Sequence, residues 1–381
     1  MSDVLVVGGG VIGLSLAYEL AGQGARVRLV DRGPLGREAS WAGAGILPPG
    51  SRQPTNDPIG ELHRLSDELY PIWSAQLREE TGVDNGFCIC GGIYLAAGDQ
   101  EREELERSAA TWQAQGIRAE RLGGDALAKR EPSLATGLAS QAECVAWWLP
   151  DEAQVRNPRH LKALALGCVR RGVVLEPGVA VEGFKTASGR VISALTAQGE
   201  IACEQVCITG GPWSGGLVSQ LGAKVAVRPK RGQMVLLSSP RPVLRSIVNI
   251  GHQYLVPRPD GRILIGSTVE DAGFDKRTTA QAIAGLLDLA VRVAPPLANL
   301  SLEQCWAGLR PASHDDLPYI GRLADFDNAF LATGHFRSGL QLSPGTAVLM
   351  SQLLAGVDPT IDPRPFRVDR PADPLFAENA R

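Results

Sequence analysis

Residues 3–20 read DVLVVGGGVIGLSLAYEL, and this stretch decides the fold. Its first part, residues 3–7, is a short apolar run that ends at glycines, as buried strands often do. A helical pattern follows the glycines, and Gly22 and Gly24 are expected to end it. Residues 26–30 then form a second apolar run. The segment therefore predicts a β-turn-α-β unit.

The turn of this unit carries Gly8, Gly10 and Gly13 at the spacing G-x-G-x-x-G, directly after a strand and at the start of a helix. The first glycine permits a tight turn, the second lets the backbone approach a pyrophosphate, and the third lets helix and strand pack closely. Asp31 follows about 20 residues later, where a carboxylate accepts hydrogen bonds from a ribose diol. The pattern predicts a dinucleotide site but does not separate FAD from NAD.

The composition indicates an ordinary globular protein of one or two domains, with 381 residues, 44% of them hydrophobic, and a formal net charge of −3. A charge so close to zero does not favour binding to nucleic acid or to an anionic membrane surface, so the expected partner is a small molecule. The first strand is not preceded by a signal-peptide pattern, and later apolar runs are too short to insert in a membrane.

The seven cysteines are scattered and odd in number, which favours a reducing cytoplasm over a disulfide scaffold. Cys88 with Cys90, or Cys203 with Cys207, could be taken for metal-binding pairs. Neither is completed by a second pair or by a histidine cluster, so they are better explained as small buried hydrophobes. No metal is expected.

The rest of the chain alternates helix and strand patterns. Helices are expected at residues 57–80, 99–115, 160–171, 279–293 and 344–354, and strands at 87–96, 173–175, 205–209, 233–237, 253–257, 262–266 and 329–332. The segment from 225 to 266 is rich in strand-like patterns, which favours a mixed or antiparallel sheet. The C-terminal end, rich in Pro and Asp, is expected to be a tail.

Several further segments resemble the D-amino-acid oxidase and glycine oxidase family of flavoproteins. They are REASWAGAGILPP at 37–49, ITGGPWS at 208–214, RPKRGQ at 228–233, WAGLRP at 306–311 with residues 316–321, and TGHFRSG at 333–339. Their order and spacing match the family over nearly the whole chain. Within it the chain is most similar to the bacterial glycine oxidases of thiamine biosynthesis, through GHQYLVPR at 251–258 and GSTVEDAGFDKR at 266–277.

The resemblance implies an α/β fold, α+β overall, in which a Rossmann-type FAD-binding domain is joined to a discontinuous substrate domain with a mixed or antiparallel sheet. The FAD-binding domain is expected to comprise residues 1–85, 141–220 and 305–381, and the substrate-binding domain residues 86–140 and 221–304. The family also implies a homo-oligomer.

The same resemblance implies noncovalent FAD. Some sarcosine oxidases bind the flavin through a C-terminal cysteine thioether, and this sequence has no cysteine after Cys305. Asp31 stands where such flavoproteins more often carry Glu, and a small backbone shift would let it reach the ribose. The residues expected to bind FAD are Gly8, Gly10, Ile12, Gly13, Asp31, Arg32, Ala39, Ser40, Ala44, Gly45, Ile46, Val179, Gly210, His335, Phe336, Arg337, Ser338, Gly339, Leu340 and Gln341.

Three residues are expected to handle the substrate. Arg310 could grip an α-carboxylate with two parallel charge-assisted hydrogen bonds, or form a structural ion pair. The family places Tyr254 beside it as a second donor to that carboxylate, although a strand tyrosine can also serve only to pack its ring. Arg337 could add positive charge near substrate or flavin, and His252 could line the entrance; both could instead be structural hydrogen-bonding residues.

The expected reaction is oxidation of the C–N bond of glycine, sarcosine, D-alanine or D-proline by FAD and dioxygen, giving an imine or 2-oxo acid, ammonia and hydrogen peroxide. No dedicated base is required, because desolvation can lower the pKa of the amine. An amino-acid or imino-acid dehydrogenase that passes electrons to a quinone or protein is the alternative. An NAD-dependent dehydrogenase and a nonenzymatic flavin-binding subunit also remain open.

Overall fold

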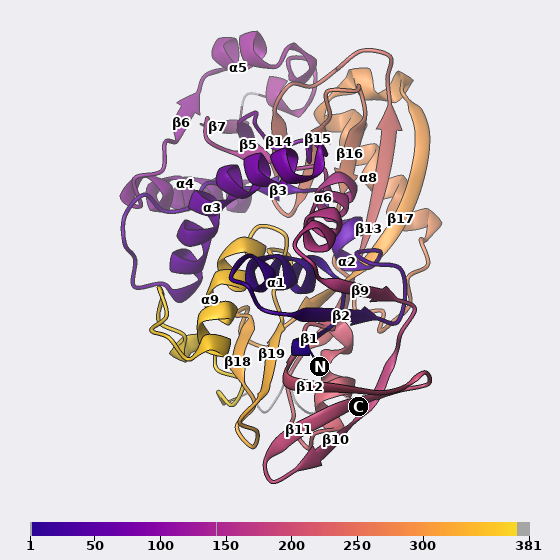
Figure 1. The fold of residues 1–381 in the computed structure, drawn as a ribbon. Coiled ribbons are helices and arrows are strands. Elements are labelled where there is room, and N and C mark those ends of the chain that lie inside the picture. The colour runs from indigo at the N-terminus through magenta and orange to yellow at the C-terminus, as the bar shows by residue number, and fades with distance from the viewer. Residues whose placement is uncertain (1, 142, 372–381) are drawn as a thin grey trace.

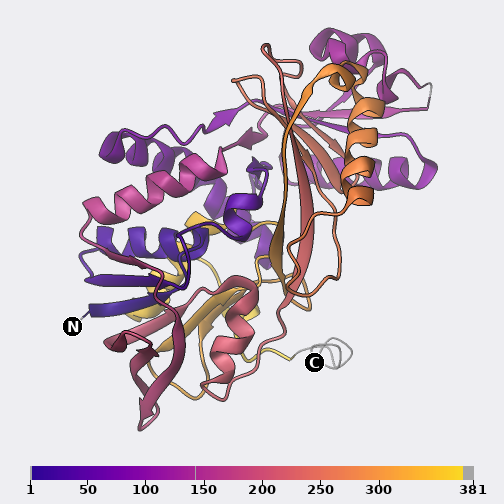
Figure 2. The same cartoon turned by 90° about the vertical axis from the view of Figure 1, so that its right-hand side faces the viewer.

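Two sheets of eight strands each form the frame of the protein. Figures 1 and 2 show how they are arranged. The computed structural model describes residues 2–141 and 143–371. The centre of the first sheet is parallel, in the order β19 (Ala329–Thr333), β12 (Gly199–Ile208), β1 (Ser2–Val7), β2 (Val27–Asp31) and β9 (Val174–Pro177). The N-terminal segment thus forms the predicted β-turn-α-β unit at the middle of this sheet.

One edge of the first sheet, β9, is parallel to its neighbour, and the antiparallel strands all lie at the other side of the sheet. β18 (Tyr319–Arg322) pairs with β19, and β10 (Val181–Ala187) and β11 (Arg190–Thr196) form a ribbon that pairs with the first part of β12. The sequence analysis did not anticipate this ribbon. Its strands are half exposed and carry many polar residues, so they lack the apolar runs that mark the buried strands.

Both faces of the parallel strands are buried, which explains why β1 and β2 read as continuous apolar runs. Val4 and Val6 face a layer of four helices, α1 (Val11–Gly22), α3 (Pro58–Thr81), α6 (Asn157–Arg170) and α9 (Ser343–Ala355). Leu5 and Val7 face the opposite side, which is covered by the ribbon and by α7 (Ser214–Ser219). α1 ends at Gly22, one of the two glycines predicted to end it, and Gly24 follows with φ of +90°.

The second sheet is mixed, as predicted. Its order is β17 (Ser301–Ala312), β13 (Arg228–Ser238), β16 (Ile263–Gly266), β15 (Gln253–Pro257), β14 (Ile247–Ile250), β5 (Gly92–Ala96), β7 (Val145–Leu149) and β6 (Glu120–Leu122). The β14–β5 pair is parallel and the other pairs are antiparallel. α8 (Ala280–Val293) buries Leu286 and Leu289 against the face that lies away from the first sheet in Figure 2.

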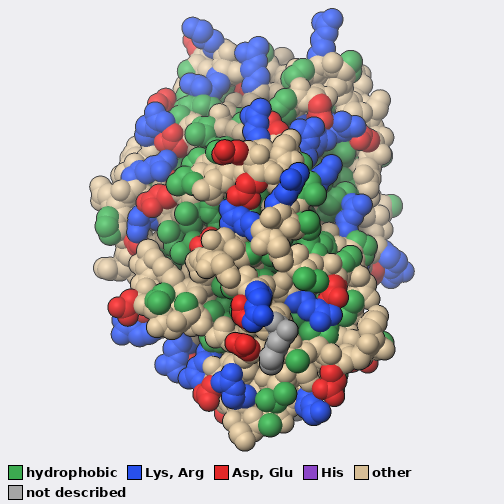
Figure 3. Space-filling model, in the orientation of Figure 1, with side chains coloured by type: hydrophobic (Ala, Val, Ile, Leu, Met, Phe, Trp, Pro, Cys, Tyr) green, Lys and Arg blue, Asp and Glu red, His purple; other side chains and the backbone are tan. Residues whose placement is uncertain are grey.

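The remaining elements complete the structure. They are α2 (Ala39–Ala42), α4 (Asp99–Ala114), α5 (Gly124–Arg130), a small sheet of β3 (Ile46–Leu47), β8 (Ala153–Gln154) and β4 (Cys88–Ile89), and 3-10 turns at Pro132–Leu134, Leu138–Ser140, Gly211–Trp213, Pro295–Asn299 and Arg364–Phe366. Among the described residues, the helices are too short or too polar to cross a membrane. Acidic and basic side chains are interspersed on the face drawn in Figure 3.

Two findings differ from the expectations. β7 and β17 pair in the second sheet, although the predicted domain bounds place residues 145–149 and 305–312 with the first; an apolar run does not reveal which strand will pair with it. The division into two domains otherwise stays a prediction. The tail prediction is wrong up to residue 371, because Phe366 is fully buried and Arg370 binds Asp315 at 2.8 Å. Its remainder, residues 372–381, lies outside the described residues.

Candidate functional site

A cavity of about 700 Å³ lies between the two sheets, at the carboxyl ends of the parallel strands, which is where open α/β sheets bind their ligands. Residues from β1, β2, β19 and the turn after β12 line one side, and Tyr94, Asn249, Tyr254 and Arg310 from the second sheet line the other. All predicted cofactor-binding residues line this cavity except Gly13. The structure therefore brings the predicted site residues together, while their individual roles stay predictions.

The glycine turn at the start of α1 is packed too closely for side chains. A Cβ at Gly13 would lie 1.9 Å from the carbonyl oxygen of Gly8, and one at Gly8 would lie 2.6 Å from that of Thr209. Gly8 also has φ of +118°, which other residues rarely adopt. Gly10 faces the cavity, and its nearest neighbour beyond the turn is Ser40 Oγ at 3.3 Å from a Cβ position. The turn leaves room for a ligand against the helix N-terminus.

Asp31 ties the ends of the strands together. Its Oδ2 accepts a hydrogen bond of 2.7 Å from Gly9 N, and its Oδ1 accepts one of 2.8 Å from Gly33 N. The Asp31 carbonyl accepts from Val179 N at 2.8 Å, which brings the predicted Val179 to the same end of the cavity. The Arg32 guanidinium lies 3.8 Å from the centre of the Trp213 ring. Each Asp31 oxygen keeps a second lone pair for a ligand hydroxyl.

The loop at residues 39–46 is fixed by side chains that the sequence analysis missed. Ser40 Oγ accepts from Val11 N at 2.9 Å, and Asn157 Nδ2 donates to the Ser40 carbonyl at 2.7 Å. The buried Arg258 donates to the Ala44 carbonyl at 2.6 Å, and burial lowers its pKa to about 10. Nothing in the local sequence separates Asn157 from an ordinary residue at the start of a helix, or Arg258 from a surface arginine.

The second loop, residues 335–341, precedes α9 as predicted. Phe336 N donates to the Pro311 carbonyl at 2.8 Å, and Gln341 Nε2 donates to the Pro48 carbonyl at 2.8 Å. His335 is buried, its Nε2 lies 3.1 Å from Thr346 Oγ1, and burial lowers its pKa to about 3. His335 is therefore a neutral structural group, and residues 335–341 of this loop line the cavity.

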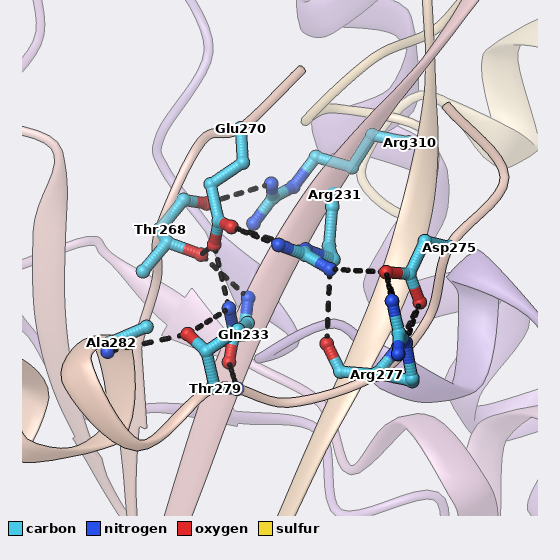
Figure 4. Close-up of polar contacts among 9 residues, drawn as sticks. All are labelled: Arg231, Gln233, Thr268, Glu270, Asp275, Arg277, Thr279, Ala282 and Arg310. Atoms are coloured by element: carbon cyan, nitrogen blue, oxygen red, sulfur yellow. Dashed lines mark hydrogen bonds and ion pairs between the residues drawn. The ribbon is translucent and has the colours of Figure 1, made fainter. Parts of the chain in front are cut away.

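Arg310 projects from β17 into the cavity and is held on one side. Its Nη1 donates to the Thr268 carbonyl at 3.1 Å (Figure 4). Its Nη2 donates to Ser267 Oγ at 2.5 Å. The guanidinium lies over Gly232, where a Cβ would come within 2.2 Å of both Nη atoms. Burial lowers the pKa of Arg310, and the hydroxyl of Tyr254 opposes that shift. Arginine stays charged even so, because its pKa begins so high.

Tyr254 and Arg337 lie near this guanidinium. The Tyr254 hydroxyl is 3.5 Å from Met234 Sδ, and it also interacts with the Arg310 side chain. Arg337 Nη2 donates to the His252 carbonyl at 2.8 Å, and the positive charge of Arg337 contributes to the lowered pKa of Arg310. The three predicted substrate residues thus share one end of the cavity.

Comparison with known proteins decides the family. A family model described as FAD dependent oxidoreductase matches residues 3–353. The chain belongs to the FAD dependent oxidoreductase family. Its cofactor is FAD, and its activity is the oxidation of amines or amino acids. The predicted family, the predicted enzyme class and the predicted fold class are confirmed.

Named members of the family are similar over nearly the full length. The glycine oxidase of Pseudomonas putida is 37% identical over 374 residues, which cover 96% of this chain and 97% of that protein. The glycine oxidase of Geobacillus kaustophilus is 34% identical over 370 residues, 97% of each chain. The crystal structure of glycine oxidase from that organism matches with a TM-score of 0.92 at 33% identity, covering 98% of this chain and 99% of that one.

The residues of this FAD dependent oxidoreductase fit the cofactor. A pyrophosphate can approach α1 only where no Cβ intervenes, and Gly10 leaves that space open. Asp31 and residues 335–341 both line the same cavity. Its polar groups are few and well placed, as in other cofactor sites.

The wall opposite the loops holds a polar cluster that the sequence analysis missed. Asn249 lies directly between Tyr94 and Tyr254 in the strand register, and its Nδ2 donates to Glu152 Oε1 at 3.1 Å. Glu152 is fully buried; burial raises its pKa to about 7, although Tyr94 and Asn249 both act to lower it. A single Glu after an apolar strand resembles a surface residue in sequence, so it carried no signal.

Proposed function

We propose that this protein oxidises the C–N bond of glycine and of other small amino acids or amines, such as sarcosine, D-alanine and D-proline. The products are the imine or 2-oxo acid, ammonia and hydrogen peroxide, with dioxygen as the final electron acceptor. The observation that carries the proposal is a partly buried arginine, Arg310, that lines the cavity and is held there by neutral acceptors. The relatives named glycine oxidase support the choice of substrate.

Arg310 is proposed to bind the substrate carboxylate. Its two known acceptors, the Thr268 carbonyl and the Ser267 hydroxyl, are uncharged, so the positive charge is not neutralised by a neighbouring acid. A guanidinium has five N–H donors, which leaves donors for the two oxygens of a carboxylate. The Tyr254 hydroxyl lies beside it and can donate to the same group.

The chain also favours loss of the proton from the substrate amine. FAD supplies a two-electron acceptor when bound. An ammonium group near Arg310 and Arg337 is disfavoured by their positive charge, and the enclosed cavity disfavours it further by desolvation. Both effects lower the pKa of the amine, so a free amine can form at neutral pH without a dedicated base.

The remaining roles are proposals on the same grounds. The predicted cofactor residues would hold FAD without a covalent bond, with Gly10 at the pyrophosphate and Asp31 at the ribose. A cytoplasmic location, a homo-oligomer and a contribution to thiamine biosynthesis stay predictions. The relatives named bifunctional protein ThiO/ThiG, one of them 31% identical over 98% of this chain, support the last.

The test is to mix the FAD-loaded protein anaerobically with glycine, sarcosine, D-alanine and D-proline separately and to follow the absorbance of oxidised flavin. Bleaching by glycine that air reverses, with formation of hydrogen peroxide, is the expected result. Bleaching that air does not reverse would instead indicate the dehydrogenase alternative. No bleaching by any of the four would overturn the proposed substrate class.

A further inference from the structure

The segment GSTVEDAGFDKR, residues 266–277, supplies the acceptors of Arg310. The Thr268 carbonyl accepts from Nη1 at 3.1 Å and Ser267 Oγ accepts from Nη2 at 2.5 Å. A guanidinium is planar and its donors are fixed in that plane, so the groups that it binds set its direction. Whatever holds this segment in place therefore determines where Arg310 points.

The carboxylate of Glu270 is the centre of the contacts that hold the segment (Figure 4). Its Oε2 accepts from Arg231 Nε at 3.1 Å and from Arg231 Nη2 at 2.5 Å. Its Oε1 accepts from Gln233 Nε2 at 2.9 Å and from the hydroxyl of Thr268. The four donors occupy the four lone-pair positions of a carboxylate.

The backbone reinforces this arrangement. Arg231 N donates to the Glu270 carbonyl at 2.9 Å and Glu270 N donates to the Arg231 carbonyl at 3.0 Å, so the segment pairs with β13. Gln233 N donates to Thr268 Oγ1 at 2.9 Å. The side chain of Thr268 is thus held from two sides, and its carbonyl is left to face Arg310.

The network ends at α8. Gln233 Oε1 accepts from Thr279 N at 2.8 Å, and Thr279 Oγ1 caps the helix by accepting from Ala282 N at 3.4 Å. Arg231 also lies 3.3 Å from Asp275. The contacts therefore run without a break from the N-terminus of a helix to the guanidinium of Arg310, as Figure 4 shows.

Glu270 is well placed to stay charged. Burial acts to raise its pKa, but the hydrogen bonds from Thr268, Arg231 and Gln233 outweigh burial and hold the pKa below its usual value. The side chain of Arg231 is only 9% exposed and that of Glu270 27% exposed. A pair buried to this extent loses much when one partner loses its charge, because the other is left uncompensated.

We propose that Glu270 is a positioning residue for Arg310. Its carboxylate fixes Thr268, and the Thr268 carbonyl in turn directs the guanidinium toward the substrate carboxylate. Glu270 is not among the residues that line the cavity and acts only through its neighbours. The inference rests on the proposed function, since it takes Arg310 as the group that binds the carboxylate.

The experiment measures binding of acetate to the FAD-loaded protein by isothermal titration calorimetry. Acetate presents a carboxylate without an amine, so it cannot be oxidised. Glu270→Gln is expected to weaken acetate binding about tenfold, less than the full loss of one charge-assisted hydrogen bond, because the guanidinium is misaligned and not removed. In an Arg310→Lys background the same change is expected to have no effect, because the aligned guanidinium is absent.

The matched control is Glu303→Gln. Glu303 also lies in the second sheet and pairs with an arginine, Arg262 at 2.8 Å, but on the part of β17 that is far from the cavity. It is expected to leave acetate binding unchanged. If Glu270→Gln fails to fold, Thr268→Val removes one hydrogen bond to the Glu270 carboxylate, keeps its charge, and is expected to weaken acetate binding in the same background-dependent way.

Two results would overturn the positioning role. One is wild-type acetate affinity in both Glu270→Gln and Thr268→Val. The other is an equal loss of affinity with Arg310 and with Arg310→Lys, which would indicate a general structural effect. A different result would contradict the proposed function itself. If Arg310→Lys alone binds acetate as the wild type does, then Arg310 does not bind the substrate carboxylate, and the positioning role of Glu270 is contradicted as well.

Discussion

Replacing Arg310 with alanine is expected to reduce kcat/KM for glycine about a thousandfold. The guanidinium can give the substrate carboxylate two charge-assisted hydrogen bonds of about 2 kcal/mol each, and about 4 kcal/mol corresponds to about 10³-fold. Arg310→Lys keeps one positive charge but loses the planar pair of donors, so we expect a loss of about 30-fold, equivalent to one such bond.

The assay is anaerobic stopped-flow reduction of the flavin over a range of glycine concentrations, which separates the apparent dissociation constant from the limiting rate. A contact made equally before and during the reaction changes binding more than rate, so most of the loss is expected in the dissociation constant. Arg262→Ala is the control, because Arg262 pairs with Glu303 in the same sheet and away from the cavity. A dissociation constant for Arg310→Ala within twofold of the wild type would refute the reasoning.

Three further predictions concern the cofactor turn, the buried acid and the substrate hydroxyl. Gly13→Ala places a Cβ 1.9 Å from the Gly8 carbonyl oxygen, so the free energy of unfolding in denaturant should fall by about 3 kcal/mol and the purified protein should retain less FAD. The control Gly285→Ala should show neither effect, because its Cβ meets nothing within 4 Å. Burial raises the pKa of Glu152 from 4.5 to about 7, so the folded state binds its proton more tightly than the unfolded state does. The free energy of unfolding should therefore fall by about 3 kcal/mol as the pH rises from 4.5 to 7. Glu152→Gln should abolish this pH dependence in unfolding curves. Tyr254→Phe should raise the KM for glycine about fivefold in steady-state assays while flavin content stays constant, and an unchanged KM would remove its role.

The sequence was most informative where backbone chemistry is restrictive. Gly8 and Gly13 could be assigned from spacing alone, because the turn and the close packing tolerate no other residue. The strands of the first sheet were visible as apolar runs because both of their faces are buried. Arg310 was identified by resemblance, and the structure then placed it in the cavity.

What could not be predicted depends on contacts between distant parts of the chain. Asn157 and Arg258 hold the loop at residues 39–46 from more than 100 residues away, and no local pattern marks a residue for such a task. Glu152 is buried because strands β5 and β14 close over it. The predicted domain bounds separate residues 305–312 from β13, with which β17 pairs, because pairing depends on the neighbouring strand and the segment itself does not contain that information.

The position of Arg310 on β17 is expected to affect which carbon of a substrate can react. The same strand carries Arg310 and, one residue later, the Pro311 carbonyl that accepts a hydrogen bond from Phe336 N. The proposed carboxylate-binding residue, Arg310, and the loop at residues 335–341 are therefore connected through adjacent residues of one strand, which fixes the distance between them. With Arg310 as the proposed carboxylate anchor, an α-amino acid and a β-amino acid are expected to present different carbons at the same distance from it. The strand is then expected to select which carbon reacts before the cavity walls select size.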